Sequence, residues 1–206
     1  MTSRNQILNQ LRTNQTPFDL PSASPHPPVV PLEDLSAEAL IEQFLKSAEA
    51  VLAKTYRVKT ESEVYPILET LIGDDNEILS WDPKWMPKHY AEWLERQSLK
   101  TSVNNDQLRV GITSCDAALA ATGSLVLIAG QGKPRAVSLL PELHIAIVKA
   151  SQLVPDLETW IASAAPHFQD ASNIVLITGP SKTADIAQIL ILGAHGPREL
   201  HIILLE

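Results

Sequence analysis

Residues 178–197, TGPSKTADIAQILILGAHGP, have the residue types and spacing in this chain that best suit binding of an anion. An apolar strand ends at the first Gly-Pro turn, and Ser181 or Thr183 can cap a helix that follows it. Backbone N–H groups at the start of such a helix suit phosphate, carboxylate or thioester oxygens, and Asp185 suits the positive end of its dipole. The second Gly-Pro turn presents His195, whose titration range suits proton transfer. The alternative is a purely structural strand, turn, helix and turn.

A second candidate segment, GITSCDAALAATGSLVL, follows another strand. Ser114 is expected to open a short helix there, and the turn at Thr122 and Gly123 lets the chain pass close to a ligand or to another backbone. A plain helix cap and turn explains the same residues. Cys115 could have a lowered pKa near a helix start, but we favour its interpretation as a small buried residue.

The third candidate is the glycine-rich turn AGQGKPR, with Gly130, Gly132, Lys133 and Arg135. Its spacing does not match the phosphate-binding pattern GxxxxGK[ST]. A solvated loop with two charges is therefore the favoured interpretation. The chain also lacks HExxH, GxSxG, CxxC and GxGxxG motifs, so metalloprotease, α/β-hydrolase, thiol-redox and dinucleotide-binding functions lose their main support.

Composition limits the classes of function. The chain has 206 residues, 45% hydrophobic and 19% charged, with a net charge of −8. This acidic balance disfavours binding to nucleic acid or anionic lipid, although a local site can still be positive. The single cysteine precludes an intrachain disulfide and disfavours a metal cluster held by thiolates. The sequence shows neither a signal peptide nor a membrane-spanning run. Together, these features predict a cytoplasmic protein.

Hydrophobic patterning divides the chain into an arm over residues 1–34 and a domain over 35–206. The arm is expected to hold a short amphipathic helix over 3–13 and an extended proline-rich tether over 17–31. In the domain, helices are expected at 36–54, 62–73, 82–97, 114–121, 154–168 and 181–192. Strands are expected at 55–59, 77–81, 108–113, 123–129, 173–178 and 198–205. Residues 136–150 are expected to form a strand region that a proline interrupts. Strands that are apolar on both faces and alternate with helices predict an α/β fold with a mainly parallel sheet flanked by helices.

Four blocks together resemble one family. DAALAATGSLVL, RAVSLLPELHIAIV, TGPSKTADIAQILILGAHGP and RELHIILL are similar to the signature blocks of the lactate utilisation protein C family (LutC/YkgG, or LUD domain), in order over about residues 108–206. The resemblance implies a NagB/RpiA/CoA-transferase-like fold and an accessory role in L-lactate utilisation. It also implies that iron–sulfur clusters are carried by partner oxidoreductase subunits, with no cofactor in this chain.

The resemblance carries two departures. Ala121 stands where the family often has an acidic residue, and related CoA transferases use a glutamate near a comparable turn as nucleophile, so such a mechanism would lack its key group. Lys182 stands where the family commonly has arginine, and lysine keeps the charge but loses bidentate recognition of an acid group.

We therefore predict a small-anion site in which His195 and Asp185 take catalytic roles. Lys182 would add charge, and backbone N–H groups nearby would hold the anionic oxygens. The residues predicted to line the ligand are Thr122, Gly123, Gly179, Pro180, Ser181, Lys182, Thr183 and Gly196. Two alternatives stay open: a stand-alone CoA-transferase or sugar-phosphate-isomerase-like enzyme, with Asp116 or Asp185 as its carboxylate, and an interaction protein that docks through its N-terminal arm. A homo-oligomer is compatible with each.

Overall fold

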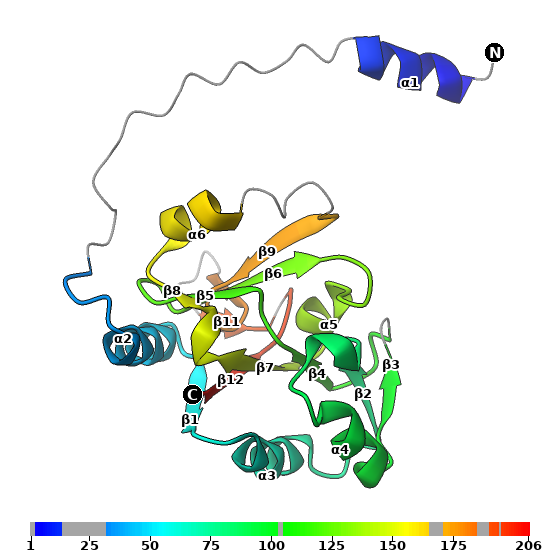
Figure 1. The fold of residues 1–206 in the computed structure, drawn as a ribbon. Coiled ribbons are helices and arrows are strands. Elements are labelled where there is room, and N and C mark those ends of the chain that lie inside the picture. The colour runs from blue at the N-terminus through cyan, green and yellow to red at the C-terminus, as the bar shows by residue number, and fades with distance from the viewer. Residues whose placement is uncertain (1–2, 14–31, 103–104, 165–170, 185–189, 194) are drawn as a thin grey trace.

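The computed structural model describes residues 3–13, 32–102, 105–164, 171–184, 190–193 and 195–206. Its centre is a six-stranded sheet in which every neighbouring pair of strands is parallel, in the order β1-β12-β7-β4-β2-β3 (Figure 1). The bounds of its strands are β1 Lys54–Val58, β2 Glu77–Ser80, β3 Lys100–Ser102, β4 Val110–Thr113, β7 Leu143–Lys149 and β12 Glu199–Leu205. The predicted α/β class with a mainly parallel sheet is confirmed.

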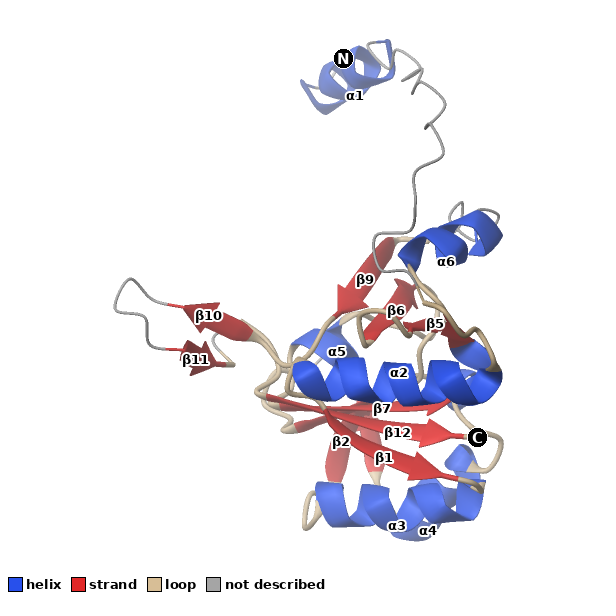
Figure 2. Cartoon of the chain, turned by 90° about the vertical axis from the view of Figure 1, so that its left-hand side faces the viewer, coloured by secondary structure: helices blue, strands red, loops and turns tan. Residues whose placement is uncertain are grey.

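Helices cover both faces of this sheet. In Figure 2, α2 (Ala37–Ala50) lies on one face, while α3 (Glu61–Ile72) and α4 (Tyr90–Gln97) lie on the other. Ser36 caps α2 as expected, because its hydroxyl accepts the backbone N–H of Ala39 at 3.4 Å. The buried side of α2 presents Ile41, Phe44 and Ala48 to the core. Amphipathic spacing therefore fixes which side of this helix meets the sheet.

A second sheet of four strands packs beyond α2, in the order β8-β5-β6-β9 (Figure 2). Its strands are β5 Ala117–Leu119, β6 Ser124–Ala129, β8 Leu153–Val154 and β9 Asn173–Ile177. The remaining elements are α1 Ser3–Thr13, η1 Pro83–Trp85, α5 Ala136–Leu139, η2 Ala150–Gln152, α6 Leu157–Ala164, β10 Lys182–Ala184 and β11 Leu190–Leu192. The chain leaves the first sheet at the end of β4 and enters the second at β5, so residues 114–116 cross from one sheet to the other.

The helix predicted over 114–121 is wrong, because β5 occupies its centre. Ala117 packs into a small cluster with Val126 and Trp160, whereas Ala118 packs into the main core. Alanine favours helices, but here two buried faces and pairing with β6 override that preference. Ser114 therefore caps no helix, and the second candidate segment loses the helix start on which its anion site depended.

The helix predicted over 181–192 is also wrong. Strands β10 and β11 pair in antiparallel fashion, with Lys182 opposite Leu192 and Thr183 opposite Ile191, and Figure 2 shows this hairpin projecting from the body of the protein. The apolar run from Leu190 to Leu192 suits a strand as well as a helix, so the sequence pattern alone does not decide between them. No helix N-terminus follows the turn at Gly179, so that part of the argument for an anion site is lost.

Candidate functional site

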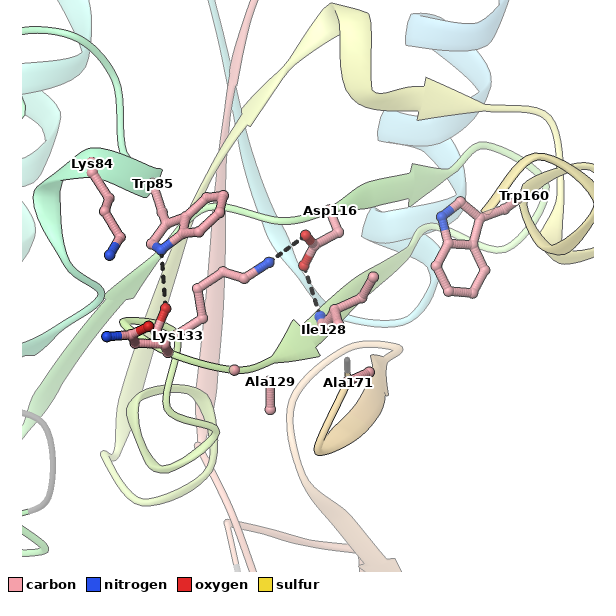
Figure 3. Close-up of a pocket in the computed structure, with 10 residues that line it drawn as sticks. Lys84, Trp85, Asp116, Ile128, Ala129, Lys133, Trp160 and Ala171 are labelled. Atoms are coloured by element: carbon pink, nitrogen blue, oxygen red, sulfur yellow. Dashed lines mark hydrogen bonds and ion pairs between the residues drawn. The ribbon is translucent and has the colours of Figure 1, made fainter. Parts of the chain in front are cut away.

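A cavity of about 510 Å³ opens where the chain crosses between the two sheets (Figure 3). Asp116 enters it from the crossing segment, Ile128 from β6, Trp85 from η1 and Trp160 from α6. The full lining consists of Lys84, Trp85, Asp116, Ile128, Ala129, Gly130, Gln131, Lys133, Trp160 and Ala171. Elements far apart in the sequence thus supply both polar and aromatic groups to the lining of this cavity.

The polar centre of this cavity is an ion pair between Lys133 and Asp116. The Lys133 ammonium donates to one carboxylate oxygen of Asp116 at 2.5 Å, and the backbone N–H of Ile128 donates to the other at 2.7 Å (Figure 3). The two side chains are 10% and 23% exposed, respectively. Both partners are therefore largely removed from water, and each compensates the other's charge.

Two tryptophans surround the Lys133 ammonium. Its nitrogen lies 5.4 Å from the centre of the Trp81 ring and 4.7 Å from that of Trp85, distances at which aromatic rings attract a cation. Trp85 is itself held in place, because its indole N–H donates to the carbonyl of Gln131 at 3.3 Å. The lysine is thus fixed in position before any ligand arrives.

The glycine-rich turn builds this arrangement. Gly130 and Lys133 exchange backbone hydrogen bonds at 3.0 and 3.3 Å, and Gly132 between them has a φ of 79°. The carbonyl of Gly132 accepts the backbone N–H of Asp82 at 2.9 Å, which joins the turn to η1. Glycine permits this left-handed conformation at low cost, and the resulting tight turn directs Lys133 inward.

A second cavity of about 430 Å³ adjoins the first and shares Ala129, Gly130 and Lys133 with it. Arg135 and Ser172 also line this second cavity. The charged residues lining the two cavities are Lys84, Lys133, Arg135 and Asp116, so cations outnumber the carboxylate. A positive site therefore exists on a chain whose net charge is −8.

The predicted turns at Gly123 and Gly179 lie elsewhere, against the C-terminal part of α2. A Cβ atom on Gly123 would lie 2.2 Å from the backbone nitrogen of Ala48, and one on Gly179 would lie 2.2 Å from the carbonyl oxygen of Val51. The hydroxyls of Thr122 and Ser124 are 2.7 Å apart, which braces the turn. These contacts give both glycines a structural role in seating α2 on the second sheet.

The other described residues of the predicted site meet at the base of the β10–β11 hairpin. The Lys182 ammonium donates to the carbonyl of Val51 at 2.8 Å, and the backbone N–H of Ser181 donates to that of Pro197 at 2.8 Å. Gly196 lies beside Ser181, Pro180 is buried, and His195 is exposed. Asp185 lies outside the described residues, as does the side chain of Thr183. The anion site at these residues stays a prediction, and none of those described lines either cavity.

The sequence pattern singles out Lys133 and Arg135 but favours a solvated loop, and it gives no sign of the contact between Lys133 and Trp85. Of these residues, Lys133 is buried, with 8% of its surface exposed. The signal that could have found this site is the combination of a tight glycine turn with an acidic residue, Asp116, three positions beyond the end of an apolar strand. The turn and the segment with Asp116 lie apart in the sequence, so the pattern indicates a site only once these two segments are known to be neighbours.

Two titratable side chains outside both cavities are buried. Burial raises the pKa of the Cys115 thiol well above its usual range, and the interpretation of Cys115 as a small buried residue is confirmed. Burial lowers the pKa of His144 to about 3, so this histidine stays neutral in the core, where its Nε2 lies 2.9 Å from the Thr113 hydroxyl. Within the described ranges, no cluster of three or more histidine, cysteine or acidic residues could hold a metal ion, and no helix is long and apolar enough to span a membrane.

Together, the parallel sheet, the second sheet and the cavity at their junction define an α/β protein with a pocket in which lysine and arginine outnumber the carboxylates. The chain belongs to the LUD domain family, whose profile matches residues 41–205. A lactate utilization protein C of Shouchella clausii is 30% identical over 211 residues, which cover 93% of this chain and 90% of that protein. A lactate utilization protein C of Macrococcus caseolyticus is 37% identical over 135 residues, 60% of this chain and 58% of that protein.

One solved structure supports the fold. The crystal structure of a DUF162 family protein from Deinococcus radiodurans has a TM-score of 0.64 and 19% identity, over 84% of this chain and 100% of that chain. With several curated relatives the match spans less than two thirds of the relative's length, as with the 58% of the Macrococcus protein. The activity of the whole protein is accordingly a matter for proposal.

Proposed function

We propose that this chain is an accessory subunit in L-lactate utilisation that binds a small anion in the cavity around Lys133 and Asp116. The names of its relatives support the pathway. In this proposal, lactate is oxidised to pyruvate in the cytoplasm together with iron–sulfur and oxidoreductase partner subunits, and this chain needs no cofactor of its own. The observation that carries the binding role is the oriented, largely buried Lys133–Asp116 pair with further cations around it.

The chemistry of the pair suits binding of a carboxylate. One N–H of the Lys133 ammonium is directed at Asp116, which leaves others for a ligand oxygen. Hydrogen bonds between charged groups are stronger than neutral ones, and low exposure strengthens them further. Asp116 keeps the ammonium in place, so binding a ligand costs little reorganisation of the lysine side chain.

The stand-alone enzyme stays the main alternative, because Asp116 is a carboxylate within a cavity. A covalent CoA-transferase step needs a carboxylate oxygen that is free to attack. Both oxygens of Asp116 accept hydrogen bonds, from Lys133 and from Ile128. This engagement favours a role in binding over one as a nucleophile. Exposed Ile7 and Leu8 on α1 are compatible with docking through the arm, the other alternative.

The proposal is tested by growth on L-lactate of a bacterium that lacks its own lactate utilization protein C. We expect the wild-type chain to restore growth and the double variant Lys84→Ala/Arg135→Ala to reduce the growth rate at least about threefold, since it removes two cations from the site. These exposed side chains contribute little to stability, so protein abundance should not change.

The matched control is Lys46→Ala/Lys59→Ala, which removes the same charge from exposed positions outside both cavities. A bacterium that carries this control variant should grow on L-lactate at the same rate as one that carries the wild-type chain. The anion site at the predicted turns is tested in parallel by His195→Ala. Normal growth of the cavity variant together with loss of growth for His195→Ala would move the site to the hairpin base, and failure of the wild-type chain to restore growth would refute the role in lactate utilisation.

A further inference from the structure

We propose that the two adjoining cavities bind one organic molecule with two acid groups that is larger than lactate. One acid group would lie at Lys133 and Lys84, and the other at Arg135. This inference rests on the proposed anion site and specifies the class of its ligand. It combines the size of the cavities, the distribution of their charges and the open surface at Gly130.

Size is the first argument. Even at about 30 Å³ per non-hydrogen atom, the share of one water molecule in the liquid, lactate fills less than about 200 Å³. The first cavity has about 510 Å³, and the second has about 430 Å³. Cavities of roughly 300–1,000 Å³ are typical for ligands much larger than lactate. A lactate molecule alone would leave most of this space to water.

Charge is the second argument. Lys84, Lys133 and Arg135 face one lining carboxylate, Asp116, which leaves a surplus of two positive charges across the two cavities. Asp82 lies 3.5 Å from the Lys84 ammonium, but both side chains are about half exposed, so solvent weakens that pair. A ligand with two acid groups matches this surplus, whereas a single carboxylate neutralises half of it.

The distribution of the cations also favours two separated acid groups. Lys84 lines the first cavity and Arg135 the second, while Lys133 lies at their shared wall. The planar guanidinium of arginine suits a carboxylate or a phosphate through paired hydrogen bonds. A molecule that spans both cavities therefore meets a charged donor near each end.

Gly130 lies at the wall that the two cavities share. It lines both, and a Cβ atom built on it would meet no atom within 4 Å. Its φ is not in the positive range, so a larger side chain there would fit the backbone. The missing side chain thus leaves open space where the two cavities adjoin, and a branched residue at this position would occupy part of the space that a ligand spanning both cavities needs.

The test is isothermal titration calorimetry on the full chain with L-lactate, adipate, phosphoglycerate and fructose bisphosphate. These last three probes carry two carboxylates, one carboxylate with one phosphate, and two phosphates. We expect at least one of them to bind about tenfold or more tightly than L-lactate, and the probe that does so identifies the preferred acid groups. Arg135→Ala should then weaken that probe about tenfold while changing the affinity for lactate less than about threefold.

Gly130→Val should weaken the same probe at least about tenfold, and Gly130→Ala, which adds a smaller side chain, should weaken it less than Gly130→Val does. Thermal unfolding of both variants verifies that the fold is intact. Binding of all three probes no tighter than that of lactate would overturn the inference, as would tight binding that survives both Arg135→Ala and Gly130→Val. If lactate binds and these probes do not, the proposed function stands without this inference. If a probe binds tightly but the wild-type chain does not restore growth on lactate, the inference stands without that function.

Discussion

Replacing Gly123 by alanine should lower the free energy of unfolding by about 2 to 5 kcal/mol. Gly123 has a φ of 66°, where an L side chain costs about 1 to 2 kcal/mol. An added Cβ would also lie 2.2 Å from the backbone nitrogen of Ala48, and relief of such overpacking costs about a further 1 to 3 kcal/mol. Urea denaturation followed by circular dichroism measures the loss.

Gly130→Ala provides the matched control for this prediction. The chemical change is identical, but Gly130 has no positive φ and no atom near the added methyl group. We expect a change in unfolding free energy within about 0.5 kcal/mol for this variant. Equal effects of the two substitutions would contradict the structural role assigned to the Gly123 turn.

Breaking the Lys133–Asp116 pair should have an effect of similar size. Lys133→Ala leaves the Asp116 carboxylate in a largely buried site without its cation, and Asp116→Ala does the reverse. Removal of one partner from a buried pair costs roughly 3 to 5 kcal/mol. We expect about 2 to 4 kcal/mol here, because 23% of the Asp116 side chain still reaches solvent.

The double variant Asp116→Ala/Lys133→Ala tests whether the two side chains act as a pair. Neither charge remains unpaired in it, so its loss of unfolding free energy should be smaller than the sum of the single losses by about 1 to 3 kcal/mol. The measurement is a double-mutant cycle from urea denaturation of all four proteins. Additive losses would show that the contact contributes no coupling, and the preformed site would lose its main support.

Most of the central sheet could be predicted from the sequence, because its strands are apolar on both faces and its helices are amphipathic. The α2 helix is the clearest case: Ser36 caps it, and Ile41 and Phe44 face the core. The second sheet was harder to predict. The alanines of β5 favour a helix locally, and pairing with β6 and β8, which lie later in the chain, decides their conformation. The β10–β11 hairpin was not predicted for a related reason: a short apolar run suits a helix or a strand.

The candidate site was predictable only in part. The glycine-rich turn at Gly130 is visible as a sequence pattern, and so is Lys133 within it. The pairing of Lys133 with Asp116 depends on how β5 and β6 align, and the position of Trp85 depends on the packing of η1 against the turn. The helix predicted over 82–97 is divided into η1 and α4. Trp93 is in the core, with 2% exposure, whereas Trp85 lines the cavity.

The central claim is that the anion binds at the Lys133–Asp116 cavity rather than at the turns around Gly123 and Gly179. Two-dimensional ¹H–¹⁵N spectra of the labelled chain, recorded during titration with L-lactate, test it most directly. We expect the largest shift changes at the backbone amides of Ile128 and Gly130 and at the indole N–H of Trp85, with those of Gly123 and Gly179 unchanged. Changes confined to Gly123, Gly179 and their neighbours would contradict the claim.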